Sequence, residues 1–151
     1  MPTITLETQI SATPQRCFDL ARDVAVHCST VAFTQERALP PGVTEGRLDL
    51  GDLVIFEARH LGVRQQLHAR IVRMEPPHLF ADEMVRGAFK SLYHLHEFLP
   101  DDGGGTLMRD TITWEAPLGL LGRLADFLFL RRHLKRFLER KNAAFKALAE
   151  R

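Results

Sequence analysis

The spacing of apolar residues changes once along this chain, near residue 118, and that change limits what the chain can fold into. Before it, apolar and polar residues alternate over short segments, which is the period of half-buried strands. After it, leucine and phenylalanine recur every three or four residues, which is the period of an amphipathic helix. These residues are Leu121, Leu124, Leu128, Leu134, Leu138, Phe145 and Leu148. The sequence therefore predicts a series of strands followed by one helix of roughly eight turns, at about 3.6 residues per turn.

Six segments before residue 118 have the alternation typical of strands. They cover about residues 4–10, 53–60, 63–74, 79–85, 89–99 and 106–115. Leu61-Gly62 separates two of them as a two-residue hairpin turn, because glycine accepts the positive φ that such a turn requires. With this turn, Phe56 lies opposite Leu67, so apolar residues of both strands fall on one face of the sheet.

Two short helices are expected directly after the first strand. Thr13 is a suitable N-cap residue, and Pro14 then occupies the first helical position. Cys17 and Phe18 begin the apolar face of this helix, and residues 24–27 form the second.

The fold class predicted from these elements is α+β, in one domain over residues 1–151. A long amphipathic helix does not bury its apolar stripe alone, and an antiparallel sheet of six or seven strands has one apolar face to cover. If the C-terminal helix lies over the concave face of a curved sheet, both surfaces are covered. A hollow remains wherever helix and sheet diverge.

The same segments resemble the START-like superfamily, also called SRPBCC or helix-grip proteins. The resemblance is carried by Pro76–Asp82, Gly87–Phe89, His94–Phe98, Gly105–Asp110, Pro117–Gly119 and Arg131–Leu134. It points to a bacterial branch of polyketide cyclase/dehydrase-like ligand-binding proteins. Membership implies the helix-grip fold and a cavity for a small apolar ligand. It implies no single activity, because the superfamily includes binders, transporters and enzymes.

The expected cavity wall combines inward-facing strand residues with two leucines of the C-terminal helix. They are Phe56, Leu67, Phe80, Met84, Phe89, Leu92, His94, His96, Met108, Asp110, Trp114, Leu124 and Leu128. For any one apolar residue, simple core packing is the alternative. The binding interpretation depends on the whole set, which would hold a ligand through apolar area removed from water, at about 25 cal/mol per Å².

A histidine–aspartate pair is expected in or near this cavity. His94 and His96 share one face of their strand, and the glycine-rich turn at 101–105 pairs even positions with even ones on the next strand. Asp110 then lies opposite one of the two imidazoles, where it fixes the tautomer and favours the protonated ring. The pair has three interpretations: a structural hydrogen bond, a polar anchor for a ligand, or acid–base catalysis by His94, His96 and Asp110.

No metal or cofactor is expected. His94 and His96 could bind a metal together with His60 and Asp110, but two histidines two residues apart are a weak signal. The glycines at 103–105 lie in a hairpin rather than between a strand and a helix. Their position does not indicate a phosphate-binding loop.

A basic cluster follows the most apolar part of the last helix. It consists of Arg131, Arg132, His133, Lys135 and Arg136. The net charge of the chain is only +1, so no nucleic-acid partner is expected. A solvated helix face explains the cluster. The alternative is weak contact with an anionic membrane surface, to which each basic residue contributes roughly 1 kcal/mol. Exposure of Phe129, which belongs to neither face, distinguishes the two.

The predicted function is binding or carriage of a small hydrophobic molecule: a lipid, a polyketide or an aromatic compound. The main alternative is an enzyme of the cyclase, dehydratase or hydrolase type that uses the histidine–aspartate pair. A third hypothesis is an interaction module with a vestigial pocket, which binds a protein or a membrane surface. Two cysteines, Cys17 and Cys28, and an N-terminus without a basic and apolar leader indicate a cytoplasmic protein with reduced thiols.

Overall fold

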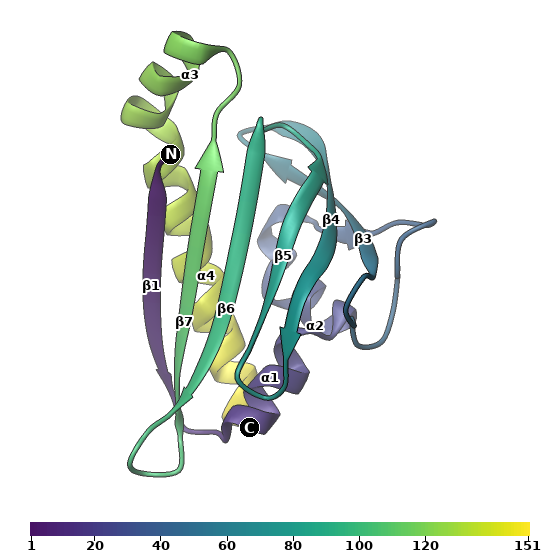
Figure 1. Cartoon of the computed structure of the whole chain (residues 1–151), viewed down its shortest axis with the longest axis vertical. Coiled ribbons are helices and arrows are strands. Elements are labelled where there is room, and N and C mark those ends of the chain that lie inside the picture. The colour runs from purple at the N-terminus through teal and green to yellow at the C-terminus, as the bar shows by residue number, and fades with distance from the viewer.

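The computed structural model describes residues 1–151, apart from the side chain of Asp126. Its strands form one seven-stranded antiparallel sheet in the order β1-β7-β6-β5-β4-β3-β2 (Figure 1). The strands are β1 (Thr3–Ile10), β2 (Arg37–Ala38), β3 (Leu53–His60), β4 (Val63–Glu75), β5 (Leu79–Arg86), β6 (Ser91–Pro100) and β7 (Thr106–Glu115). The sequence predicts an antiparallel sheet of six or seven strands, and the structure confirms it with seven.

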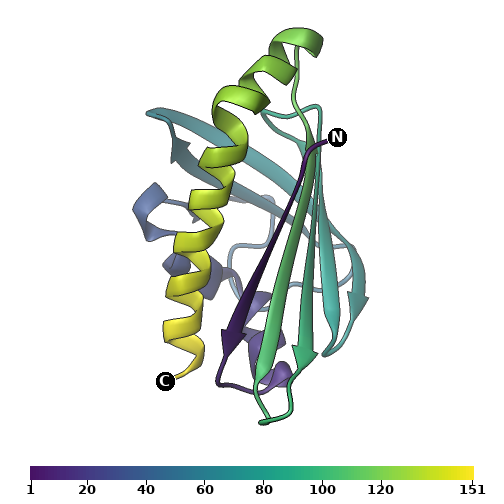
Figure 2. The same cartoon turned by 90° about the vertical axis from the view of Figure 1, so that its left-hand side faces the viewer.

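The helices also follow the predicted order. They are α1 (Pro14–Ala21), α2 (Val24–Thr30), the 3-10 turn η1 (Ala32–Thr34), α3 (Gly119–Ala125), the π turn η2 (Asp126–Leu130) and α4 (Arg131–Ala149). The last three run on without a break, so the predicted long helix is present and contains one π turn. Figure 2 shows α4 lying along the concave side of the sheet, with the two short helices at its C-terminal end.

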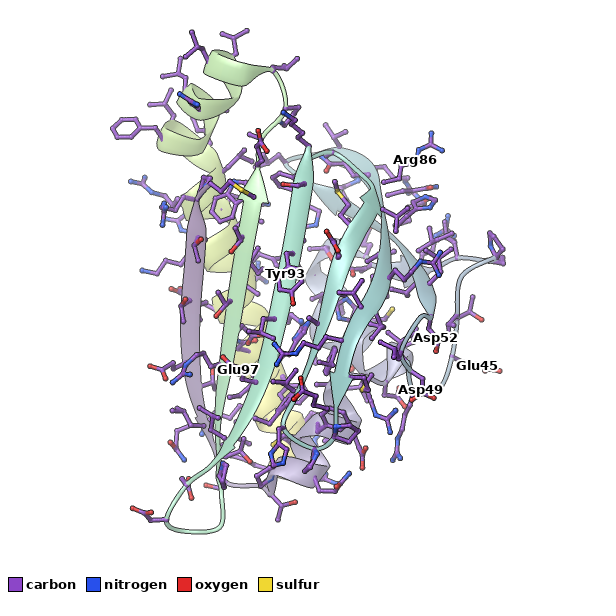
Figure 3. All side chains as sticks on the ribbon, viewed as in Figure 1. Glu45, Asp49, Asp52, Arg86, Tyr93 and Glu97 are labelled. Carbon is purple, nitrogen blue, oxygen red and sulfur yellow. The ribbon has the colours of Figure 1, made fainter. Side chains whose placement is uncertain are left out.

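Both predicted hairpins have the expected register. Leu61 and Gly62 adopt positive φ angles of 52° and 77°, and Phe56 lies opposite Leu67. On the second hairpin, His96 lies opposite Asp110, and even-numbered residues of β6 face even-numbered residues of β7. Tyr93 and Glu97, labelled in Figure 3, lie on the opposite, convex face of β6. The alternation therefore points both histidines toward α4.

The first short helix begins where the sequence predicts. Thr13 is its N-cap, and the Thr13 hydroxyl accepts a hydrogen bond from the Arg16 amide at 3.2 Å. Pro14 follows in the first turn, where its missing N–H costs no hydrogen bond. The cap places Phe18 on the buried side of α1, where its ring packs edge-on against Phe80 and Phe98.

We expect Thr13→Ala to lower the free energy of unfolding by about 1 kcal/mol, because the Arg16 amide loses its acceptor. Urea unfolding followed by circular dichroism measures the change. Thr44→Ala is the matched control, since Thr44 is exposed and caps no helix that the structure describes. Equal stability of the two variants would contradict a capping role for Thr13.

Two apolar clusters lie between the sheet and the helices. One surrounds Phe18, Phe80 and Phe98 at the end where α1 packs, and the other surrounds Trp114 and Leu138 farther along the sheet. On β6 the second cluster includes Leu92 and the first includes Phe98. His94 and His96 therefore lie between the two clusters.

The first part of the C-terminal helix projects beyond the sheet (Figure 1). We call residues 118–130 the helical overhang. At about 1.5 Å per residue, residues 119–149 extend to roughly 46 Å, whereas a strand of 10 residues such as β6 extends to roughly 33 Å. The predicted stripe therefore has no sheet to contact at its beginning, and Leu120 and Phe127 are 80% and 86% exposed. Over the residues described, no helix is both long and apolar enough to cross a bilayer.

Candidate functional site

A cavity of about 400 Å³ lies between the concave face of the sheet and the C-terminal helix. Strands β3 to β6 form one wall, and residues from α3 to α4 form the other. Ala58 and Ala69 are two small residues of the sheet wall, and their short side chains leave space that larger residues would fill. The hollow predicted from the divergence of helix and sheet is therefore present.

Seven of the predicted wall residues line this cavity. They are Phe56, Leu67, Phe80, Phe89, Leu92, His94 and His96. They come from four neighbouring strands and the turn before β6, and each strand residue points inward because of the two-residue alternation. The two-residue alternation accounts for the direction of the six strand residues, whereas Phe89 lies in a turn.

The other predicted wall residues lie elsewhere. Trp114 and Met108 are buried within the two apolar clusters, and Met84 packs against the cluster that contains Trp114. Leu124 and Leu128 do not line the cavity; they are 53% and 48% exposed on the helical overhang, whose Leu118 and Leu121 do line it. The prediction that these five residues form the wall is wrong.

Asp110 lies behind the cavity wall and connects both histidines to the helix. Its Oδ1 accepts a hydrogen bond from His94 Nε2 at 2.9 Å and lies 3.2 Å from His96 Nδ1. Its Oδ2 accepts from Asn142 Nδ2 at 2.9 Å, and Asn142 belongs to α4. Asp110 is 1% exposed, so these donors replace the water that a carboxylate requires. The predicted aspartate thus holds two imidazoles rather than one.

A second carboxylate, Asp82 on β5, completes the group. Its Oδ2 accepts a hydrogen bond from His96 Nε2 at 2.9 Å. His96 therefore has a carboxylate at each ring nitrogen, and its ring stacks on that of His94 with centroids 3.7 Å apart. We call Asp82, His94, His96, Asp110 and Asn142 the histidine–aspartate cluster.

The cluster separates the protonation states of its two histidines. Burial and the neighbouring His96 lower the pKa of His94 to about 4, so this imidazole is neutral at neutral pH. Burial also opposes a charge on His96, but hydrogen bonds to Asp110 and Asp82 outweigh it and raise its pKa. Burial likewise opposes ionisation of Asp110, yet hydrogen bonds from both histidines hold its pKa well below the ordinary value. The ring between the two carboxylates therefore keeps its proton to a higher pH than the ring of His94.

Lys141 of α4 brings a further charge to the cavity. It is 9% exposed and lines the cavity, and its ammonium has no hydrogen-bond or ion-pair partner among the described residues. Its positive charge contributes to the lowered pKa of Asp82, after the opposing effect of burial and the hydrogen bond from His96. A buried ammonium is costly unless a partner or a ligand compensates it. Lys141 is therefore available to a polar group of a bound molecule.

Two more pairs line the cavity nearer to α2 and the β3–β4 turn. His27 Nε2 lies 2.6 Å from Glu36 Oε1. Burial raises the pKa of Glu36, but this hydrogen bond outweighs burial and keeps the pKa below its ordinary value. His60 Nδ1 lies 3.1 Å from His133 Nε2. His60 therefore joins His133 rather than the histidine–aspartate cluster, and His133 faces the cavity instead of the basic surface.

Sequence reasoning missed Asp82, Lys141, Asn142, Glu36 and His133 as site residues. A signal existed for some of them, because Asp82 shares a strand face with Phe80, and Lys141 falls three residues after Leu138 in the helical stripe. A charged residue on an inward face indicates a buried polar site. For Glu36 and His133 the sequence pattern contains no comparable signal.

Solved structures of other proteins are similar to this chain over almost its full length. No curated protein matches the sequence. The solved structure of TTHA0849 from Thermus thermophilus is 19% identical, covers 98% of this chain and 99% of that chain, and has a TM-score of 0.75. A START superfamily protein from Mycobacterium smegmatis is 11% identical, with coverage of 98% and 97% and a TM-score of 0.74. These similarities show the helix-grip fold.

One family model matches nearly the full length. It describes polyketide cyclase/dehydrase and lipid transport proteins, and it matches residues 1–150. The match agrees with the seven-stranded sheet, the two short helices after β1 and the long C-terminal helix. The chain therefore belongs to the polyketide cyclase/dehydrase and lipid transport family.

Proposed function

We propose that this protein binds a small, largely apolar molecule in the cavity between sheet and C-terminal helix. The observation that carries the proposal is the cavity itself, whose volume of about 400 Å³ falls in the range of small-molecule sites. Aromatic and aliphatic side chains form most of the wall, so removal of apolar area from water supplies the binding free energy. A lipid chain, a polyketide or an aromatic compound has the required chemistry.

Polar groups on one side of the cavity orient this ligand. Lys141 presents positive charge, His96 has a raised pKa, and the neutral imidazole of His94 lies beside them. A ligand with an oxygen at one end satisfies the Lys141 ammonium, while its apolar remainder contacts Leu67 and Leu92. Family membership supports the same ligand class.

Titration with N-phenyl-1-naphthylamine, a neutral apolar dye that fluoresces out of water, tests the proposal. We expect saturable binding of one dye per chain. A control titration with Phe127→Ser, which alters only the exposed helical overhang, should leave this affinity unchanged. Absence of saturable fluorescence would remove the main support for a binding function.

A second candidate function is acid–base catalysis on the bound molecule. The observation that favours it is a pair of stacked imidazoles lining one cavity, His96 with a raised pKa and His94 with a lowered pKa, since an acid and a base require pKa values that are pushed apart. His94, His96 and Asp110 are the residues proposed to act, in cyclase, dehydratase or hydrolase chemistry. Loss of turnover of a β-dicarbonyl substrate in His96→Ala, with dye binding retained, would favour the enzyme.

The helical overhang is proposed to contact an anionic membrane surface. Phe129 is 63% exposed, which is the feature that distinguishes membrane contact from a solvated face. Arg132, Lys135 and Arg136 are exposed on the helix that follows. Leu118 and Leu121 belong both to the overhang and to the cavity lining, so the apolar surface is continuous with the cavity. Apolar insertion flanked by basic residues is the chemistry of interfacial helices.

We expect Phe127→Ser to reduce binding to vesicles of phosphatidylcholine and phosphatidylserine about thirtyfold, because a phenylalanine that is 86% exposed contributes roughly 2 kcal/mol when it leaves water. Vesicle co-sedimentation measures the partition. Val72→Ser is the matched control, since Val72 is an exposed apolar residue of β4 far from the overhang in sequence.

Two results would oppose membrane contact. Equal partition of Phe127→Ser and Val72→Ser would show that the overhang does not insert. A stable dimer in analytical ultracentrifugation, abolished by Phe127→Ser, would assign the apolar surface to a second copy of the chain.

A further inference from the structure

We propose that Asp82, His94 and His96 form a binding site for a divalent transition-metal ion in the wall of the cavity. The inference goes beyond ligand binding, and no step of it requires the cavity to be occupied. Each of the three side chains offers one donor atom, and these three atoms all lie within 4.8 Å of one another. Sequence spacing alone did not favour a metal, because two histidines two residues apart are a weak signal, and the partners considered there were His60 and Asp110 rather than Asp82.

Strand register brings the third ligand to the two histidines. Asp82 of β5 lies opposite His94 of β6, and His96 follows His94 on the same strand face. Bonds of about 2.0–2.2 Å in a tetrahedral site separate ligand atoms by roughly 3.3 Å. Asp82 Oδ2 and His96 Nε2 are already 2.9 Å apart, so side-chain adjustments suffice to admit an ion. Both strands belong to the interior of the sheet, which keeps the ligands in place.

Asp110 and Asn142 supply the support that metal-binding histidines require. A ligating imidazole normally donates its other ring N–H to a carboxylate, which fixes the ring and its tautomer. Asp110 Oδ1 accepts from His94 Nε2 at 2.9 Å and lies 3.2 Å from His96 Nδ1, so one carboxylate holds both rings from behind. Asn142 in turn fixes Asp110.

This arrangement leaves one nitrogen of each ring for a metal. His96 Nε2 faces Asp82, and an ion there replaces the proton that the two groups now share. His94 Nδ1 has no hydrogen-bond partner among the described residues, although His94 is 8% exposed and lines the cavity. The ring of His94 is buried and faces the cavity, and hydrogen bonds within the cluster do not satisfy this nitrogen.

The charge around the site accommodates a cation. Three carboxylates lie near the ammonium of Lys141: the half-buried Glu36 and Asp82, and the buried Asp110. A divalent ion that displaces the proton of His96 offsets the negative charge that would otherwise remain on Asp82 and Asp110. Lys141 nevertheless repels a cation at Asp82, so removal of its charge should strengthen metal binding.

The donor set indicates the class of metal. Two imidazoles and one carboxylate suit Zn²⁺, Fe²⁺ or Co²⁺, whereas Mg²⁺ and Ca²⁺ prefer oxygen ligands alone. Three protein ligands leave coordination positions open toward the cavity. An ion there is placed to bind an oxygen atom of a molecule in the cavity.

Titration of the untagged, chelator-treated protein with Co²⁺ tests the site. The visible absorption of Co²⁺ reports its coordination, and isothermal calorimetry with Zn²⁺ reports affinity and stoichiometry. We expect one ion per chain, at least hundredfold weaker binding in His94→Ala, and about tenfold weaker binding in Asp110→Asn. Lys141→Met should bind at least a few times more tightly. His78→Ala is the matched control, because His78 is exposed and lies outside the cavity.

The gain expected in Lys141→Met keeps the test decisive if a ligand variant fails to fold. Absence of saturable Co²⁺ binding to the wild type, or equal affinity in His94→Ala and His78→Ala, overturns the proposal. Because N-phenyl-1-naphthylamine binding is measured without metal, loss of the metal site and loss of the binding function give different results.

Discussion

Ala58→Trp is expected to weaken N-phenyl-1-naphthylamine binding at least tenfold while leaving the stability of the protein almost unchanged. Ala58 lies on β3 with its side chain toward the cavity and is 7% exposed. An indole ring in its place extends into the hollow and occupies the space of the ligand. In a solid interior the same substitution would cost about 1–3 kcal/mol through overpacking. The two readouts together distinguish an empty cavity from a filled core.

Arg59→Trp is the matched control for this experiment. Arg59 is the next residue of β3 and points to the opposite, exposed face of the sheet. The Arg59→Trp substitution introduces the same indole ring into the same strand, but the ring does not enter the cavity. We expect dye affinity in this variant to equal that of the wild type. A large loss of stability in Ala58→Trp, with dye affinity intact, would mean that the dye binds elsewhere.

Asp110→Ala is expected to lower the free energy of unfolding by about 3–5 kcal/mol. The substitution leaves three donors, from His94, His96 and Asn142, without their acceptor in a buried site. It also leaves His96 with only one carboxylate, and breaking a buried ion pair by removing one partner is costly for this reason. Denaturant unfolding followed by tryptophan fluorescence measures the change, because Trp114 is buried on the same strand.

Asp102→Ala provides the comparison for Asp110→Ala. Asp102 lies in the exposed turn between β6 and β7, so its removal should change stability by less than about 0.5 kcal/mol. A similarly small loss in Asp110→Ala would show that the histidine–aspartate cluster contributes little to folding. Its retention in the protein would then require a functional explanation alone.

The fold was predictable because its elements are encoded locally. Leu61-Gly62 fixes one hairpin, and the alternation of β6 and β7 fixes which residues of the second hairpin face inward. Those two registers place Phe56 against Leu67, and Asp110 against His94 or His96, without knowledge of distant contacts. The apolar stripe of the last helix likewise requires only its own spacing.

The rest of the site depends on contacts between distant segments. Asp82 reaches His96 through the pairing of β5 with β6, and β5 pairs on its other side with an irregular register. Lys141 reaches the cavity through the placement of α4 on the sheet. Leu124 and Leu128 were misplaced because helical spacing says which residues share a face, but not where the sheet beneath them ends. Local patterns contain none of this information.

The central claim is that an apolar molecule enters the cavity rather than adhering to the exposed overhang. Methyl-resolved nuclear magnetic resonance with leucine labelling tests it directly, because leucines mark both places. We expect N-phenyl-1-naphthylamine to shift the methyl signals of Leu67, Leu92 and Leu134, which line the cavity, with saturation at one equivalent. Shifts confined to Leu120, Leu124 and Leu128 on the overhang would contradict it.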